Sequence, residues 1–283
     1  MSTYRIDREL GRGGMAVVHA GWHEQLERPV ALKVLAEHLA GDPEFRTRFL
    51  REARIASRLH HPNLVRTFDI AQVDGLPCIV MELVTGGTLE DGRLTRTEAA
   101  SVARGLAYAH AQGVIHRDLK PANLLRGRAG EVKIADFGIA RAAEETMVTQ
   151  VGTVLGTLRY LSPEQAEGRP VGPEADVYSL GVVLDELLDD PPAGLIARMR
   201  DPDPRRRPTA KEVAASLQGV RHRKAVSDTS LVLLASAVAC VVAGLAVALW
   251  PHHHDTKVEP VPHSSSAAQQ ARNLEAWLRR YSR

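Results

Sequence analysis

The sequence has few cysteines, little net charge and no apolar segment near its beginning. Its two cysteines, Cys78 and Cys240, exclude a disulfide framework, and neither has a neighbouring ligand that would complete a zinc site. The formal net charge of +2 gives no support to nucleic-acid binding as the main activity, so no nucleic-acid partner is expected. Residues 1–21 lack the apolar core of a secretory signal. The ordinary fractions of apolar (44%) and charged (25%) residues exclude a largely disordered chain.

Lysine is scarce as well. Only six of the 36 Lys and Arg residues are lysine. A chain that prefers arginine so strongly is expected to keep lysine where arginine cannot replace it. Lys33 and Lys120 lie in the two most informative motifs of the sequence, so they are candidates for such positions.

Residues 231–250 form the one long run without a charge. Twenty helical residues span about 30 Å, the thickness of a bilayer core, and Trp250 suits an interfacial position. More Lys and Arg precede the run than follow it, which predicts a cytoplasmic N-terminal part and an extracytoplasmic tail at the cell membrane. The alternative, a buried core helix, would have to lie outside an already complete domain.

Four segments follow from this pattern: a domain at 4–218, a basic juxtamembrane segment at 219–230, a transmembrane helix at 231–250 and a short tail at 251–283. Apolar spacing predicts strands at 28–35 and 77–84. It predicts helices at 43–59, 97–112, 176–188, 193–199 and 211–217, and a short tail helix at 267–281. The three histidines at 252–254 could bind a metal ion, but adjacent histidines in a tail are more often incidental.

Several motifs in the domain carry chemistry through their order and spacing. A glycine-rich turn, Leu10-Gly-Arg-Gly-Gly-Met-Ala-Val-Val18, precedes Val30-Ala-Leu-Lys33. Glycines let a backbone close over phosphates, and a lysine on the next strand supplies a positive charge. His116-Arg-Asp-Leu-Lys-Pro-Ala-Asn123, Asp136-Phe-Gly138, Ser162-Pro-Glu164 and Asp176-Val-Tyr-Ser-Leu-Gly181 follow in that order. Each is weak alone, but the set is hard to explain by structure alone.

At these residues the sequence resembles the eukaryotic-like (Hanks-type) protein kinases, and most of all the membrane-anchored bacterial serine/threonine kinases. The resemblance covers residues 4–218 and implies an α+β, two-lobed kinase fold. In that fold a small β-rich lobe with one helix sits on a larger helical lobe, with ATP between them. The expected partners are ATP, protein substrates with Ser or Thr hydroxyls, and the membrane through a single span. A homodimer through small residues of the span is conceivable.

The resemblance assigns roles residue by residue. Lys33 would hold the α- and β-phosphates and pair with Glu52 on the following helix, while Glu44 on the same helix lies two turns too early. The residues expected around the nucleotide are Leu10, Gly11, Arg12, Gly13, Gly14, Val18, Ala31, the gatekeeper Met81, and Glu82 and Val84 of the hinge. Ala16 stands where many kinases have a third glycine.

The catalytic assignments come from the same resemblance. Asp118 would accept the proton of the substrate hydroxyl, and Lys120 would reach the γ-phosphate. Asn123 and Asp136 would hold Mg²⁺, for which Mn²⁺ could substitute. Lys120 favours serine/threonine over tyrosine specificity, as does Thr157.

Regulation is expected in the activation segment between Asp136 and Glu164. Thr149 is the first candidate for autophosphorylation and Thr153 the second, although both could be ordinary loop threonines. Arg117 would pair with such a phosphate. Glu164 is expected to pair with Arg207.

The domain is shorter than the family pattern at two places. The helix that usually follows the hinge is expected to be missing or trimmed before the helix at 97–112. Only residues 189–199 fill the region where relatives carry a longer insert. This trimming is expected to expose apolar surface and puts substrate recognition by analogy in doubt. Two alternatives stay open: a pseudokinase or scaffold that binds nucleotide weakly and acts through partners, and a small-molecule kinase.

Overall fold

The computed structural model describes residues 3–137, 158–219 and 259–281. The expected membrane span, the juxtamembrane segment beyond residue 219 and the threonines Thr149, Thr153 and Thr157 lie outside these ranges. Within them, no helix is both long enough and apolar enough to cross a bilayer. The chain divides into two compact units, residues 1–224 and 225–283, which we describe separately.

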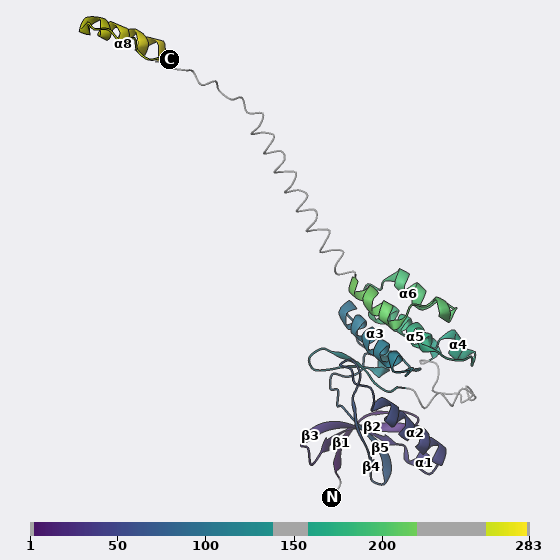
Figure 1. Cartoon of the computed structure of the whole chain (residues 1–283). Coiled ribbons are helices and arrows are strands. Elements are labelled where there is room, and N and C mark those ends of the chain that lie inside the picture. Colours follow the sequence, from purple (N-terminus) through teal and green to yellow (C-terminus); the bar gives the residue numbers. More distant parts are fainter. Residues whose placement is uncertain (1–2, 138–157, 220–258, 282–283) are drawn as a thin grey trace. The chain divides into compact units, whose positions relative to one another are not determined.

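The first part of unit 1 is a five-stranded antiparallel sheet (Figure 1). Its strands are β1 (Tyr4–Arg12), β2 (Ala16–His23), β3 (Arg28–Leu35), β4 (Thr67–Val73) and β5 (Leu76–Met81), in the spatial order β1-β2-β3-β5-β4. The β4–β5 hairpin turns at Asp74 and Gly75, which both have positive φ (52° and 81°), the backbone that a tight hairpin turn requires.

Two helices, α1 (Glu37–Ala40) and α2 (Pro43–Ala56), follow β3 and lie beside the sheet (Figure 1). The α2 helix begins where Asp42 accepts a hydrogen bond from the Glu44 amide and Pro43 occupies the first helical position. Phe49 and Ala53 of α2 are fully buried and belong to one apolar cluster with Leu35 and Ile79 of the sheet. This packing holds α2 in a defined position against β3 and β5.

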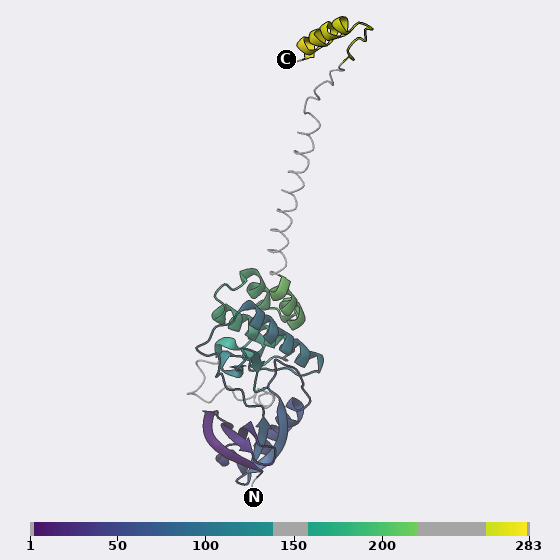
Figure 2. The same ribbon diagram turned by 90° about the vertical axis from the view of Figure 1, so that its left-hand side faces the viewer.

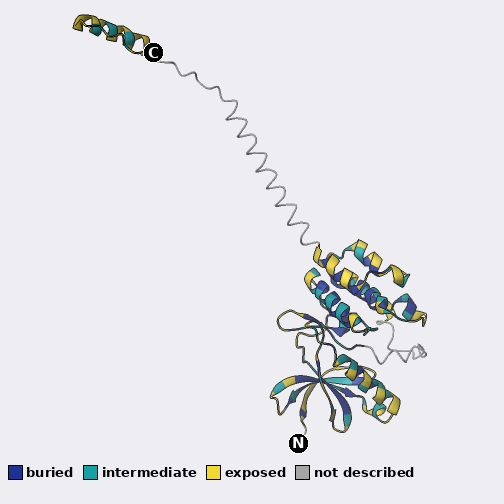
Figure 3. Cartoon of the chain, in the orientation of Figure 1, coloured by how far each residue is buried: buried dark blue, intermediate teal, exposed yellow. Residues whose placement is uncertain are grey.

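The second part of unit 1 is mainly helical (Figure 2). Its helices are α3 (Arg96–Ala111), α4 (Pro163–Ala166), α5 (Pro173–Leu187), α6 (Ala193–Met199) and the helical residues 210–219. It also holds a small antiparallel hairpin of β6 (Leu124–Arg126) and β7 (Val132–Ile134), and the 3-10 turns Pro121–Asn123, Leu158–Tyr160 and Pro204–Arg206. A single large apolar cluster, centred on the buried faces of α3 and α5, joins these elements (Figure 3).

The two-lobed protein-kinase fold expected from the sequence is therefore present. The strand at 28–35 and the helix at 193–199 have the predicted bounds. The second strand ends at Met81 rather than at residue 84, and α2 ends at Ala56 rather than at residue 59. In both cases the run of apolar residues extends past the end of the element.

The helical lobe is shortened as expected, but the expected exposure of apolar surface is not found where the two shortened segments meet. Residues 82–95 contain no helix, and they meet the turn after α5 directly. Leu94 donates its amide to the Leu187 carbonyl (2.8 Å), and Leu94 and Leu188 are 3% and 6% exposed. The two shortened segments thus cover each other, so no large apolar side chain is left exposed there.

Unit 2 contains one described helix, α8 (Ala267–Tyr281), at the bounds that apolar spacing predicts. The residues before it fold back along the helix. The Trp277 indole N–H donates to the Glu259 carbonyl, and the Asn273 side chain donates to the Pro262 carbonyl (2.9 Å). These contacts hold the segment before α8 against the helix.

Candidate active site

Lys33 is the centre of the candidate site. It lies on β3 between strands β2 and β5, and its side chain is 13% exposed. Its ammonium group is 2.9 Å from Glu52 Oε1 on α2 and 2.9 Å from Asp136 Oδ1, which follows β7. One lysine thus connects the small lobe to the helical lobe.

The structure places Glu52, and not Glu44, beside Lys33. Glu44 is exposed in the first turn of α2 and pairs with Arg48 on the same helix. Glu52 lies two turns further along, on the face that Phe49 and Ala53 bury against the sheet. The helix position, and not the charge alone, therefore selects the partner of Lys33.

The charges of this cluster stabilise one another. Burial alone would lower the pKa of Lys33, but the carboxylates of Asp136 and Glu52 raise it above its usual range. Burial alone would raise the pKa of Asp136, but the nearby Lys33 holds it below its usual value. Both groups are therefore charged throughout the neutral pH range, as phosphate and metal binding require.

The segment that carries Asp118 forms a compact loop between α3 and β6. Asn123 donates its side-chain amide to the Asp118 carbonyl (2.7 Å) and, at 3.3 Å, to the Asp118 carboxylate. The Lys120 ammonium is 3.1 Å from Asp118 Oδ2. A carboxylate acceptor, an ammonium group and an amide are thus held within a few ångströms.

Asp176, in the first turn of α5, holds the loop that carries Asp118 in place. Its buried carboxylate accepts hydrogen bonds from the backbone amides of His116 and Arg117, both at 2.7 Å. These contacts support Arg117 in a left-handed backbone conformation (φ 68°), which is strained for a residue with a side chain. The His116 ring, in turn, is 2.9 Å from the Ala135 carbonyl and so ties the loop to Asp136.

Asn123 and Asp136 offer the expected oxygen donors for a divalent cation. The Ala135 amide donates to the Asn123 carbonyl (2.8 Å), so the two donors belong to adjoining backbone segments. Among residues 3–137, 158–219 and 259–281, no group of three or more His, Cys, Asp or Glu could hold a metal alone. An Asn–Asp pair fits Mg²⁺ that takes its remaining ligands from water and phosphate.

The glycines of the glycine-rich turn at β1 and β2 have open space where a side chain would begin. A Cβ atom on Gly11 or Gly14 would meet nothing within 4 Å, and on Gly13 only the Ala16 carbonyl at 3.7 Å. None of the three has a positive φ. Neither packing nor backbone strain within the described chain therefore requires glycine here, which fits a site where a ligand's phosphates approach the backbone.

The remaining nucleotide candidates lie on the strands beside Lys33 and on the segments next to them. A small cavity between the lobes is lined by Lys33, Glu52, Met81 and Asp136, among others. Val18 on β2 pairs with Lys33, and Ala31 on β3 pairs with Met81 of β5. The other candidates lie at the edge of this region on β1 (Leu10, Arg12) and just after β5 (Glu82, Val84). Leu10 is 41% exposed, an apolar side chain available to cover a flat ring.

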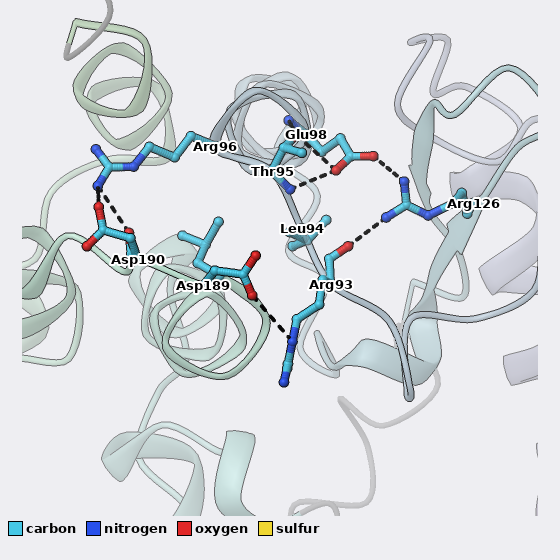
Figure 4. A pocket seen from close by; sticks show the side chains of 9 residues that line it. Arg93, Leu94, Thr95, Arg96, Glu98, Arg126, Asp189 and Asp190 are labelled. Carbon is cyan, nitrogen blue, oxygen red and sulfur yellow. Dashed lines mark hydrogen bonds and ion pairs between the residues drawn. The ribbon is translucent and has the colours of Figure 1, made fainter.

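A wider pocket, of about 390 Å³, lies away from this chemistry, where the two shortened segments meet (Figure 4). Its charged groups are already paired. Arg96 binds Asp190 (2.8 Å), Arg93 lies 3.6 Å from Asp189, and Arg126 bonds to Glu98. It lacks the lysine, carboxylate and glycine arrangement of the site at Lys33, so size alone does not mark the active site.

Glu164 and Arg207 form the expected pair inside the helical lobe. The two guanidinium nitrogens are 2.7 and 2.9 Å from the carboxylate oxygens, and the side chains are 2% and 0% exposed. Arg207 also donates to the carbonyls of Asp201 and Glu174. The pair holds α4, at the end of the activation segment, against the base of the lobe.

Sequence reasoning missed two supporting contacts. Lys133 on β7 lies 2.9 Å from the carboxylate of Glu82, at the start of the hinge. The scarcity of lysine could have singled it out. Gln165 donates its side-chain amide to the Arg117 carbonyl (2.8 Å) and so links α4 to the catalytic loop. No sequence signal joins residues so far apart in the chain.

Known proteins resemble this chain in both sequence and fold. The family model of the protein kinase domain matches residues 4–194. The chain is 46% identical over 203 residues to serine/threonine-protein kinase PknB of Mycobacterium leprae, covering 67% of this chain and 33% of that protein. It is 43% identical over 196 residues to PknL of Mycobacterium tuberculosis, covering 66% of this chain and 49% of that protein. The chain thus spans a third to a half of the length of these relatives.

A solved structure agrees with the fold. The crystal structure of the Mycobacterium tuberculosis PknI kinase domain superposes with a TM-score of 0.59 at 28% identity, covering 77% of this chain and 95% of that one. Residues 4–194, which the family model matches, contain the site from the glycine-rich turn to Asp176. The chain belongs to the protein kinase family.

Proposed function

We propose that this chain is a serine/threonine protein kinase that transfers the γ-phosphate of ATP to protein hydroxyls. The observation that carries the proposal is the position of Lys33, 2.9 Å from both Glu52 and Asp136, next to the loop of Asp118, Lys120 and Asn123. A nucleotide-binding scaffold has no need of a carboxylate base, a lysine and an amide in such contact. Serine/threonine kinases among the relatives support the same reaction class.

Each group has a task in this reaction. The open glycine-rich turn receives the phosphates, and Lys33, held by Glu52, orients them. Asp118 takes the proton of the substrate hydroxyl, and its orientation depends on the hydrogen bonds from Asn123. Lys120 adds positive charge beside the reacting oxygen, where negative charge develops.

Asn123 and Asp136 would hold a divalent cation such as Mg²⁺. A cation held there would supply positive charge that offsets the charge of the phosphates. The residues of the chain prepare this site because Lys33 keeps Asp136 ionised and the Ala135–Asn123 backbone bond keeps the two donors adjacent.

The proposal is tested with the purified full-length chain, Mg²⁺ and labelled ATP, alongside Asp118→Asn and Lys33→Met. We expect self-phosphorylation in the natural chain and a loss of about 10²–10⁴-fold in Asp118→Asn, the usual contribution of a general base. Equal nucleotide binding by Asp118→Asn would show that the loss concerns the reaction itself. Nucleotide binding without transfer, to the chain or to a generic protein, would instead favour the scaffold alternative.

We infer that the activation segment carries the regulatory phosphate. Thr149 is the first candidate and Thr153 the second, and Arg117 is the cation available to pair with a phosphate. Mass spectrometry of the same reaction tests this assignment. Label on neither threonine would exclude it while leaving the transfer reaction intact.

We also propose that residues 231–250 anchor the chain in the cell membrane, with the kinase unit in the cytoplasm and residues 251–283 outside. Twenty residues without a charge and the excess of Lys and Arg before them support this topology. Small residues such as Ala235, Ala239 and Gly244 would allow two spans to approach as a homodimer. Resistance to alkaline extraction and protease cleavage of the tail from outside intact cells test the topology. Release by alkali would contradict it.

A further inference from the structure

Helix α8 has an apolar stripe that residues 259–266, the described segment before it, leave uncovered. Along the helix, Ala267, Ala271, Leu274 and Leu278 recur at spacings of four, three and four residues and so share one face. Leu274 and Leu278 are 49% and 50% exposed. Two half-exposed leucines on one face of a short helix need an explanation, because single exposed leucines are common but aligned ones are less so.

The folded-back segment before α8 covers a different side of the helix. It contacts Gln270, Asn273 and Trp277, through bonds to the Ser264 amide (2.7 Å), the Pro262 carbonyl (2.9 Å) and the Glu259 carbonyl. These three residues are only partly exposed, whereas Leu274 and Leu278 beside them are exposed. The segment therefore fixes one edge of α8 and leaves the leucine stripe free for something else.

The opposite side of α8 is basic. Arg272, Arg279 and Arg280 are exposed, and Glu275 is the one acidic residue of the helix, paired with Arg279 at 2.9 Å. A helix with leucines on one face, arginines on the other and a tryptophan at the boundary has the composition of helices that lie in a membrane surface. Its positive charge complements anionic lipid headgroups.

A second copy of the chain fits the stripe less well. A specific dimer usually buries about 800 Å² on each partner. One 15-residue helix whose apolar face holds two leucines and two alanines offers far less than that. A lipid surface needs no matching partner surface, because the acyl region accepts any apolar stripe.

We propose that α8 docks on an anionic lipid surface through Leu274 and Leu278, so that the tail lies on the membrane instead of forming a ligand-binding domain. The inference rests on the membrane topology proposed above. Residues 251–258, between the expected span and the folded-back segment, reach at most about 28 Å when fully extended. The bilayer surface would therefore always be within reach of α8.

The test uses the full chain in vesicles of phosphatidylcholine with 30% phosphatidylglycerol, in which the phosphatidylcholine is or is not brominated. Trp22→Phe and Trp250→Phe leave Trp277 as the sole tryptophan, since the chain has three. We expect bromine to quench Trp277 fluorescence at least twofold. Leu278→Glu should abolish the quenching, whereas Ala276→Glu, which adds the same charge on the polar side of α8, should keep it.

The docking would be overturned if bromine did not quench Trp277 fluorescence, or if Leu278→Glu and Ala276→Glu reduced the quenching equally. It would also be overturned if the quenching were as strong in vesicles without phosphatidylglycerol. A fourth contradicting outcome is that Leu278→Glu lowers the fraction of dimer but leaves the quenching unchanged. The last outcome would make a second copy the occupant of the stripe. Alkaline extraction separates docking from anchoring. A chain that resists extraction but shows no quenching disproves the docking alone, and a chain that is extracted but is quenched by added vesicles disproves the span alone.

Discussion

Glu164 and Arg207 illustrate how much one pair of residues can contribute to this fold. Burial alone would raise the pKa of Glu164, but the hydrogen bonds from Arg207 hold it below its usual value of 4.5. Replacing Glu164 by Gln leaves Arg207 buried without a counter-charge. We expect the free energy of unfolding to fall by about 3–5 kcal/mol. Asp185→Asn, which breaks the exposed pair with Arg200, should cost less than about 1 kcal/mol in the same denaturant titration.

The same pair predicts a pH dependence. Because the folded pKa of Glu164 is depressed, its contribution is complete above the unfolded value of 4.5 and is lost as pH falls through the folded value. The difference in melting temperature between the natural chain and Glu164→Gln should therefore be constant from about pH 6 to 8 and shrink below about pH 4. A difference that grew on acidification would contradict the assigned direction.

Lys133 and Glu82 act at the hinge. Lys133 is 2.9 Å from the Glu82 carboxylate, which also accepts the Arg66 amide at 3.3 Å. The pair links Lys133, two residues before Ala135, to the backbone expected to bind adenine. We expect Lys133→Met to raise the KM for ATP about tenfold, equivalent to about 1.4 kcal/mol, with a smaller change in kcat. The reciprocal swap Lys133→Glu with Glu82→Lys should restore part of the affinity, and a fall in kcat alone would refute the role.

At the scale of the elements, Gly86 is where the hinge segment meets β6. Its amide donates to the Arg126 carbonyl at 2.8 Å, and a Cβ on Gly86 would lie 2.2 Å from that oxygen. Gly86→Ala must therefore push the two segments apart, and we expect it to cost more than about 1 kcal/mol of stability. Gly194→Ala in α6 is the matched control, since its Cβ would meet nothing within 4 Å. It should be neutral or stabilising by up to about 1 kcal/mol in thermal unfolding.

The spacing of apolar residues predicted helices and strands well where one face of the element packs against a core. The strand at 28–35 and the tail helix at 267–281 have their predicted bounds, since apolar spacing reports burial directly. The contacts that organise the site could not be predicted in this way. Asp176 bonds to the His116 amide and Gln165 to the Arg117 carbonyl. Such partners are remote in the chain, and only the fold brings them together.

At the scale of the whole molecule, the two shortened segments of the helical lobe pack against each other. The sequence shows the two trims but not that they are neighbours, because their contact depends on where α3 and α5 lie. Leu94 and Leu188 meet through a parallel bridge, and Arg96 reaches Asp190 across the same junction. Missing elements therefore do not by themselves imply an unstable or inactive domain.

The helical residues 210–219 complete this lobe. Ala210, Val213, Ala214 and Leu217 are at most 5% exposed and belong to the large cluster of α3 and α5. A chain shortened to residues 1–219 keeps these contacts, and we expect it to unfold in one transition and to retain self-phosphorylation. A chain shortened to 1–208 loses four buried side chains, and its melting temperature should fall by about 10 °C or more. If calorimetry gave equal melting temperatures for the two chains, the core of the domain would end before residue 210. The residues from 210 onward, like the basic and apolar segments after them, would then add nothing to the stability of the domain.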